Sequence, residues 1–80
     1  MAIAEGTVTV TVDARGLSCP MPIVKTAQAV RSLPSGALIE VLATDPGSVK
    51  DFAAWSRSTG NELVAQSVDG AVQRFLIRRK

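Results

Sequence analysis

The residues with the clearest capacity for chemistry lie in the segment Gly16-Leu17-Ser18-Cys19-Pro20-Met21-Pro22. The sequence predicts a helix that begins here, with Cys19 at its N-cap and Pro20 as its first residue. The unpaired N–H groups and partial positive charge of a helix N-terminus favour a thiolate, so we expect the pKa of Cys19 to lie below its usual value of about 8.5. Because Pro20 and Pro22 have no N–H, Met21 is predicted to supply the donor nearest to the sulfur, on a stiffened first turn.

The rest of the composition narrows what this cysteine can do. Cys19 is the one cysteine in 80 residues and there is no histidine, which excludes an intramolecular disulfide, a Cys-His or Ser-His pair and the usual zinc sites. A solitary thiol cannot complete disulfide exchange, but it can hold a group covalently and hand it on. A persulfide anion would be favoured by the same N–H groups. The alternative is a buried, inert cysteine. Its position at a loop-to-helix junction, outside the apolar periodicity, favours exposure.

Hydrophobic periodicity predicts the elements on either side of Cys19. Strict alternation over Thr7–Val12 predicts a half-buried strand, and Ala37–Ala43 is apolar enough for a strand inside a sheet. Between them a helix is predicted over Pro20–Leu33. Its expected inner face consists of Ile23, Val24, Ala27 and Val30, and its outer stripe of Met21, Lys25, Gln28 and Ser32. Cys19 therefore follows the carboxyl end of a strand, where open α/β sheets tend to bind ligands.

The second half of the chain predicts one more helix and a hairpin. Asp45 is expected to cap this helix, Pro46 to be its first residue and Gly60 to end it. Its expected inner face consists of Val49, Phe52, Ala53 and Ser56, with Trp55 at the boundary. Strands over Glu62–Val68 and Ala71–Arg78 are joined by Asp69-Gly70, which indicates a type I′ turn.

The resulting order β-α-β-α-β-β predicts an α/β two-layer sandwich. The first two strands are expected to be parallel, with both helices on one face of a four-stranded mixed sheet. Eighty residues suffice for one domain, taken here as residues 1–80 with a core over about 7–78. In the last strand, Arg74 and Arg78 alternate with Phe75 and Ile77, which indicates that the other face is wet.

Composition and charge exclude several classes of protein. A hydrophobic fraction of 46% with 20% charged residues excludes a disordered chain. A net charge of +2 is too weak a field to predict nucleic-acid binding. No unbroken apolar run exceeds four residues, and Met1–Glu5 has neither a basic nor an apolar signal region, so we expect no membrane helix and no signal peptide. These features favour a reducing, cytoplasmic setting.

Several segments together resemble the TusA-like (SirA-like) sulfur-carrier family. They are the Cys-Pro-x-Pro segment Cys19–Pro22 with Asp13-Ala-Arg-Gly16 before it and Lys25 after it, and further along Asp45-Pro46, Asp51-Phe-Ala-Ala-Trp55 and Gly60-Asn-Glu-Leu63. The resemblance runs from about Thr7 to Arg78 and implies the same sandwich. One departure is Asn61, where many members have histidine; the substitution is expected to keep the turn.

The resemblance also implies a role. Cys19 would accept a persulfide sulfur from a cysteine desulfurase or a rhodanese-like protein and pass it to an acceptor protein, while Pro20 and Pro22 shape the helix start. The pathways of the family include transfer-RNA thiolation, molybdenum-cofactor assembly and sulfur oxidation. A carrier of this kind is a sulfurtransferase only together with its partners, and it needs no metal and no cofactor beyond the covalent persulfide. We expect a monomer that forms transient complexes.

Other residues near Cys19 are predicted to support the site, and for two of them, Asp13 and Lys25, two interpretations stay open. Asp13 is either an ordinary turn residue or holds the Cys19 loop by accepting backbone N–H bonds. Gly16 is expected to have a positive φ. Arg15 and Lys25 are placed to add positive charge near the sulfur, although Lys25 fits equally well as a solvated charge or a contact to an acidic partner. Met21 suits adaptable contact with a partner.

Three further predictions concern residues farther along the chain. Asp45, the expected helix cap, can also face the Cys19 loop, because both follow the carboxyl ends of neighbouring parallel strands. Trp55 is expected in the core. Arg78-Arg79-Lys80 is expected to be a solvated tail.

Two functions of other classes compete with the carrier. A regulatory or interaction module of the same fold is consistent with the absence of a base, a metal set and a second thiol. A small RNA-binding domain is disfavoured, because the chain has three aromatic residues and no Gly-x-x-Gly loop.

Overall fold

The strands and helices follow the predicted order over residues 8–80, which the computed structural model describes. They are β1 (Val8–Ala14), α2 (Met21–Arg31), β2 (Leu38–Ala43), α3 (Ser48–Thr59), β3 (Glu62–Asp69) and β4 (Val72–Arg78). Thr7, assigned above to the first strand, and the Met1–Glu5 segment lie outside the described residues. Within those residues, neither helix has the length and apolar character that crossing a bilayer requires.

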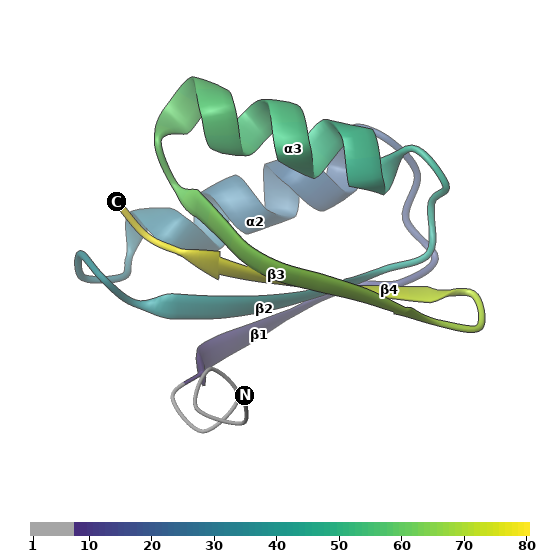
Figure 1. Cartoon of the computed structure of the whole chain (residues 1–80), viewed down its shortest axis with the longest axis horizontal. Coiled ribbons are helices and arrows are strands. Elements are labelled where there is room, and N and C mark those ends of the chain that lie inside the picture. Colours follow the sequence, from purple (N-terminus) through teal and green to yellow (C-terminus); the bar gives the residue numbers. More distant parts are fainter. Residues whose placement is uncertain (1–7) are drawn as a thin grey trace.

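The sheet has the order β1-β2-β4-β3 and is mixed, as predicted. β1 and β2 are parallel, whereas β4 is antiparallel to both β2 and β3. Both helices pack on the same face of the sheet (Figure 1). Because Ala14 pairs with Ala43, the carboxyl ends of β1 and β2 lie side by side, and each leads into the N-terminus of a helix. This arrangement decides what surrounds Cys19.

The core fills the space between the sheet and the helices. Phe52 of α3 is fully buried and stacks on Phe75 of β4, with ring centroids 4.7 Å apart. Trp55 meets Phe52 edge-on at 6.1 Å and packs against the core, as predicted. Such aromatic pairs contribute about 0.5–1.5 kcal/mol beyond the area that they bury. They attach α3 to the sheet and so position its first turn.

The buried face of α2 differs from the predicted one. Pro22, Thr26 and Val30 are its buried residues, while Val24 is 37% exposed. The spacing of apolar residues does not predict that Thr26 is buried, because threonine is polar. The Thr26 hydroxyl donates to the Pro22 carbonyl at 2.9 Å, so its hydrogen-bonding capacity is satisfied inside the helix. A threonine paired in this way can be buried at little cost, and the helix turns that side to the core.

The start of α3 also differs from the prediction. Its N-cap is Gly47, no side chain caps it, and Asp45 instead accepts a bond from the Ser48 N–H through its backbone carbonyl at 3.0 Å. The later start places Ser48 and Phe52 in the interior and leaves Val49 36% exposed. The end is as predicted: Gly60 has a φ of 83° and its N–H donates to the Ser56 carbonyl.

The hairpin between β3 and β4 turns one residue later than predicted. Asp69 pairs with Val72, so the two turn residues are Gly70 and Ala71. Gly70 has a φ of 63°, and no non-glycine residue among those described has a positive φ. A glycine first with an ordinary residue second is the pattern of a type II′ turn rather than type I′.

The face of the sheet away from the helices carries a polar network. Glu40 of β2 accepts a hydrogen bond from Thr11 of β1 at 2.8 Å and forms an ion pair with Arg74 of β4. Arg78 is exposed, and Phe75 and Ile77 are buried on the opposite side of the strand, as the alternation predicts. The network links three neighbouring strands.

The last residues are not a solvated tail. The Arg79 N–H donates to the Ala37 carbonyl at 2.8 Å, and its guanidinium donates to the Val30 carbonyl at the end of α2. The Lys80 N–H donates to the Asn61 side-chain oxygen at 2.8 Å. The prediction was wrong because these partners are distant in sequence. Buried Asn61 thus fastens the end of the chain.

Candidate functional site

Cys19 lies immediately outside α2 rather than at its N-cap. Pro20 takes the N-cap position after a cis peptide bond, and the helix begins at Met21. The Met21 N–H donates to the Ser18 carbonyl at 2.9 Å. The prediction that this N–H is aimed at the sulfur was therefore wrong, because the carbonyl of Ser18 closes a turn over Cys19 and Pro20. Pro22 becomes the second helical residue, and it is buried.

The Cys19 side chain itself is exposed and unpaired with any other cysteine. The alternative of a buried, inert thiol is wrong. Met21 is also exposed, at 47%. The entrance of α2 thus presents a sulfur nucleophile and a flexible apolar side chain on the same stretch of surface.

The carboxylate of Asp51, which the sequence analysis names only as part of the family resemblance and assigns no role at the site, acts on the sulfur. A hydrogen bond to the side chain of Asp51, in the first turn of α3, raises the pKa of Cys19; partial burial and the charges of Asp51 and Asp45 act in the same direction. The expectation of a lowered pKa was based on the N-terminus of α2 alone. Asp51 comes into contact only because the N-termini of α2 and α3 lie at the same end of the sheet (Figure 1).

Asp13 and Arg15 brace the loop that leads to Cys19. One carboxylate oxygen of Asp13 accepts bonds from the Arg15 N–H at 3.1 Å and from its guanidinium at 2.9 Å. The other oxygen accepts from the guanidinium at 3.0 Å. The side-chain bond to Arg15, followed by the backbone bond, lowers the pKa of Asp13 from 3.8 to about 2. Of the two interpretations of Asp13, this geometry favours the one in which it holds the loop.

Two further contacts fasten the same loop. Gly16 has the predicted positive φ, 80°, and its N–H donates to the Thr44 hydroxyl at 2.9 Å. Lys25 reaches back from α2 to donate to the Asp13 carbonyl at 2.7 Å. Arg15 and Lys25, predicted to add positive charge near the sulfur, both hold the loop that leads to it. Thr44 was not named in the sequence analysis, and Asp51 was named there without a role at the site.

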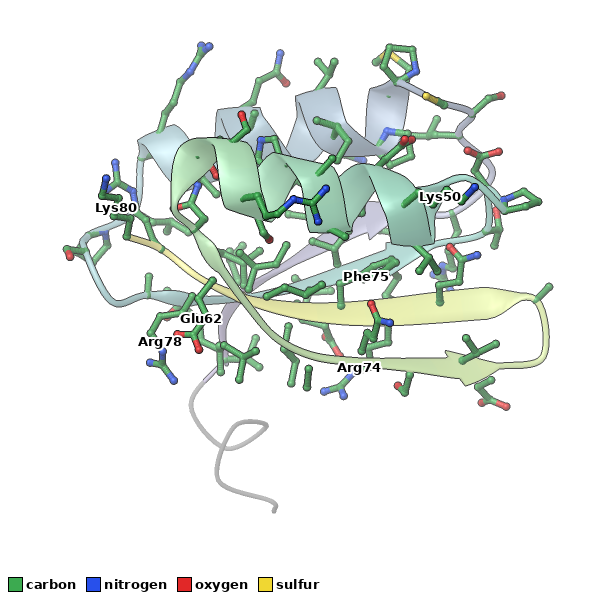
Figure 2. The ribbon with its side chains drawn as sticks, turned by 45° about the horizontal axis from the view of Figure 1, so that its top comes forward. Lys50, Glu62, Arg74, Phe75, Arg78 and Lys80 are labelled. Atoms are coloured by element: carbon green, nitrogen blue, oxygen red, sulfur yellow. The ribbon has the colours of Figure 1, made fainter. Side chains whose placement is uncertain are left out.

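The structure therefore brings the predicted site residues together in two groups. The helix entrance consists of Cys19, Pro20, Met21 and Pro22, and the brace consists of Asp13, Arg15, Gly16 and Lys25. The charge of Asp45 acts on Cys19, and its side chain does not cap α3. Asn61 accepts a bond from the Lys80 N–H, beyond the C-terminal end of α3. Figure 2 labels Glu62 and Lys80 toward one end of the molecule and Lys50, in the first turn of α3, toward the other. Within residues 8–80, no group of three His, Cys, Asp or Glu side chains is arranged to hold a metal ion.

Comparison with known proteins identifies the family. The family model described as sulfurtransferase TusA matches residues 10–79. The chain belongs to the TusA family. It is 46% identical to the sulfur carrier protein TusA of Allochromatium vinosum over an aligned stretch of 67 residues. This stretch covers 84% of this chain and 88% of that protein. It is 40% identical over 74 residues to TusA of Pseudomonas syringae, covering 92% of this chain and 88% of that protein.

Two other similarities extend this comparison. The chain is 44% identical over 71 residues to YrkF of Bacillus subtilis, covering 89% of this chain but only 38% of YrkF, which is a longer protein. The crystal structure of a SirA-like protein from Desulfitobacterium hafniense has a TM-score of 0.77 at 24% identity, covering 88% of this chain and 96% of that chain. The TusA-family chain therefore shares the two-layer fold of the SirA-like protein.

Proposed function

We propose that this TusA-family sulfur carrier holds its sulfur as a persulfide on Cys19. A donor protein such as a cysteine desulfurase or a rhodanese would load it, and an acceptor protein would take the sulfur on. The observation that carries this proposal is the exposed, unpaired Cys19 at the braced entrance of α2. The names of the TusA relatives, which describe sulfur carriers, support it.

The transfer needs no oxidant or reductant. The Cys19 sulfur attacks the outer sulfur of a donor persulfide, a new S–S bond forms, and the S–S bond of the donor breaks. Cys19–SH and donor–S–SH become Cys19–S–SH and donor–SH, with the proton passing to the departing thiolate. The Cys19 sulfur is oxidised by the amount that the donor sulfur is reduced. Delivery to an acceptor is the same exchange in the other direction.

The geometry suits a group that must be reached by two partners in turn. Cys19 is exposed, whereas the loop that carries it is fixed by three side chains, Asp13, Lys25 and Thr44. A fixed loop presents the sulfur in one position to each partner, which lowers the ordering cost of each encounter. The chain has no histidine, and we infer that the partners supply whatever further catalytic groups the exchange requires. We also infer a cytoplasmic site of action, since an unpaired exposed cysteine suits a reducing compartment.

The test is the intact mass of the protein after incubation with a cysteine desulfurase and cysteine. We expect a gain of one sulfur mass that reductant removes and that is absent from Cys19→Ala. If this donor fails, a rhodanese with thiosulfate is the second arm. A Cys19→Ala variant that still gains sulfur, or a wild type that gains none from either donor, would contradict the proposal and favour the interaction module.

A further inference from the structure

The loop that carries Cys19 receives one hydrogen bond from a distant part of the chain. The Gly16 N–H donates to the Thr44 hydroxyl at 2.9 Å, across 28 positions in sequence. The other hydrogen bonds that hold residues 15–20 in the described structure come from within residues 13–25. Leu17 also packs against the core, but an apolar contact is not directional. Thr44 is therefore the directional link between this loop and the rest of the molecule.

This link is made at the turn where β1 ends. The Leu17 N–H donates to the Ala14 carbonyl at 3.2 Å, and Gly16, the third residue of the turn, has a φ of 80°. A positive φ at this position is the pattern of a type II turn. The Arg15 N–H is bound by Asp13, so the Thr44 hydroxyl satisfies the remaining N–H of the turn.

Thr44 itself is held on both sides by packed elements. It directly follows β2, whose last residue, Ala43, is fully buried and pairs with Ala14 of β1. On the other side, the Asp45 carbonyl accepts the Ser48 N–H at 3.0 Å, at the start of α3. The Thr44 hydroxyl thus adds one bond beyond the last pair of the β1–β2 ladder, from a part of the backbone that is already fixed.

We propose that Thr44 is a positioning residue that fixes the Cys19 loop, and with it the sulfur, for the approach of a partner. The inference rests on the proposed function, because it concerns the same exchange of sulfur. That exchange requires the attacking sulfur to be aligned with the S–S bond that breaks. A fixed loop lowers the ordering cost of this alignment between two docked proteins. A small reagent that reaches the exposed sulfur by diffusion needs no such alignment with a docked surface.

The first measurement tests whether the hydroxyl holds the loop. Thr44→Val replaces the hydroxyl by a methyl group and keeps the branched shape of the side chain. By NMR hydrogen exchange on the purified full chain, we expect the Gly16 amide to exchange about fivefold faster, as for the loss of one hydrogen bond. Thr44→Ser keeps the hydroxyl and is expected to restore the wild-type rate.

The second measurement separates positioning from reactivity. It compares the rate at which Cys19 takes sulfur from saturating, persulfide-loaded cysteine desulfurase with the rate of Cys19 alkylation by iodoacetamide. In Thr44→Val we expect the transfer rate to fall about three- to tenfold and the alkylation rate to stay unchanged, because only the transfer needs an ordered approach. Thr44→Ser should recover the transfer rate.

Thr9→Val is the matched control. The Thr9 hydroxyl also accepts a backbone N–H across the β1–β2 pair, from Leu38 at 3.4 Å. Thr9 lies near the start of β1, whereas the Cys19 loop follows the end of that strand. The variant is expected to change neither the exchange of the Gly16 amide nor the ratio of the two rates.

A Gly16 amide that exchanges at the wild-type rate in Thr44→Val would overturn the proposal, because the hydroxyl would then not hold the loop. Faster exchange with an unchanged transfer rate, or with transfer and alkylation slowed equally, would overturn it too, since the contact would then be structural only. A wild type that takes sulfur from neither donor would contradict the proposed function. Hydrogen exchange involves no sulfur, so it would still decide whether Thr44 fixes the loop.

Discussion

At the scale of single residues, Asp13 shows how the Cys19 loop is held without any buried charge. The carboxylate is exposed, yet it accepts three hydrogen bonds from Arg15. Such bonds favour the ionised form, and the pKa of Asp13 falls from 3.8 to about 2. The carboxyl group of Asp13 has a lower pKa in the folded state than in the unfolded state. The stabilisation from this interaction is therefore fully present above pH 3.8 and is lost as the pH falls through about 2.

Removal of the guanidinium should reverse this shift. In Arg15→Ala we expect the pKa of the Asp13 carboxyl group to rise from about 2 toward 3.8, because the side-chain bond to Arg15 is the largest cause of the lowered pKa. The measurement is the NMR titration of the Asp13 carboxyl carbon, with Arg57→Ala as the control. Arg57 is an exposed arginine in the last turn of α3. An unchanged midpoint in Arg15→Ala would show that the ion pair does not form in solution.

At the scale of elements, the end of α3 depends on one glycine. Gly60 has a φ of 83°, in the left-handed region, and a Cβ atom there would lie 2.8 Å from Lys80 Cδ. An L-residue in this conformation costs about 1–2 kcal/mol. Two features therefore disfavour a side chain at Gly60, between α3 and β3: the positive φ and the nearby Lys80 side chain.

Gly60→Ala is expected to lower the free energy of unfolding by about 1–2 kcal/mol, as measured by urea denaturation. Gly36→Ala is the matched control, since Gly36 has a φ of 86° but open space around its missing Cβ atom. Equal losses in the two variants would show that the Lys80 side chain moves aside freely, whereas a larger loss in Gly60→Ala would measure that contact. A Gly60→Ala protein as stable as the wild type would contradict the assigned helix end.

At the scale of the whole molecule, the polar network on the face of the sheet away from the helices joins three of the four strands. The bond from Arg74, followed by the bond from Thr11, lowers the pKa of Glu40 from its ordinary value of 4.5. The network links the parallel pair of strands to the hairpin across β2. The contribution of the ionised Glu40 to stability is therefore present above pH 4.5 and declines as the pH falls through the lowered pKa of Glu40.

Glu40→Gln is expected to lower the free energy of unfolding by about 1 kcal/mol at neutral pH, a value reduced by the partial exposure of the pair. On acidification, the difference from the wild type should shrink, because the wild-type side chain becomes neutral too. Urea unfolding at several pH values measures this, with Glu62→Gln as the control for loss of one negative charge. A difference that stayed constant with pH would contradict the assignment to the ionised carboxylate.

The sequence by itself determined the order and type of the elements and the position of the candidate cysteine between the first strand and the first helix. Alternation over the strands and the helical spacing of apolar residues are local signals, and so are the Gly60 helix end and the change of structure at Cys19. Parallel pairing of the first two strands followed from the helix between them. The resemblance in the Cys-Pro-x-Pro segment pointed to the family in which the comparisons place the chain.

Only the tertiary structure decided which groups surround the sulfur. The pKa of Cys19 is raised because packing brings Asp51 and Asp45, 26 or more positions away in sequence, against the α2 entrance. Thr26 lies inside and Val24 outside for a similar reason, since the rotation of a helix is set by what it packs on. Arg79 is fastened by partners on α2 and β2. These are long-range contacts, and periodicity along the chain carries no information about them.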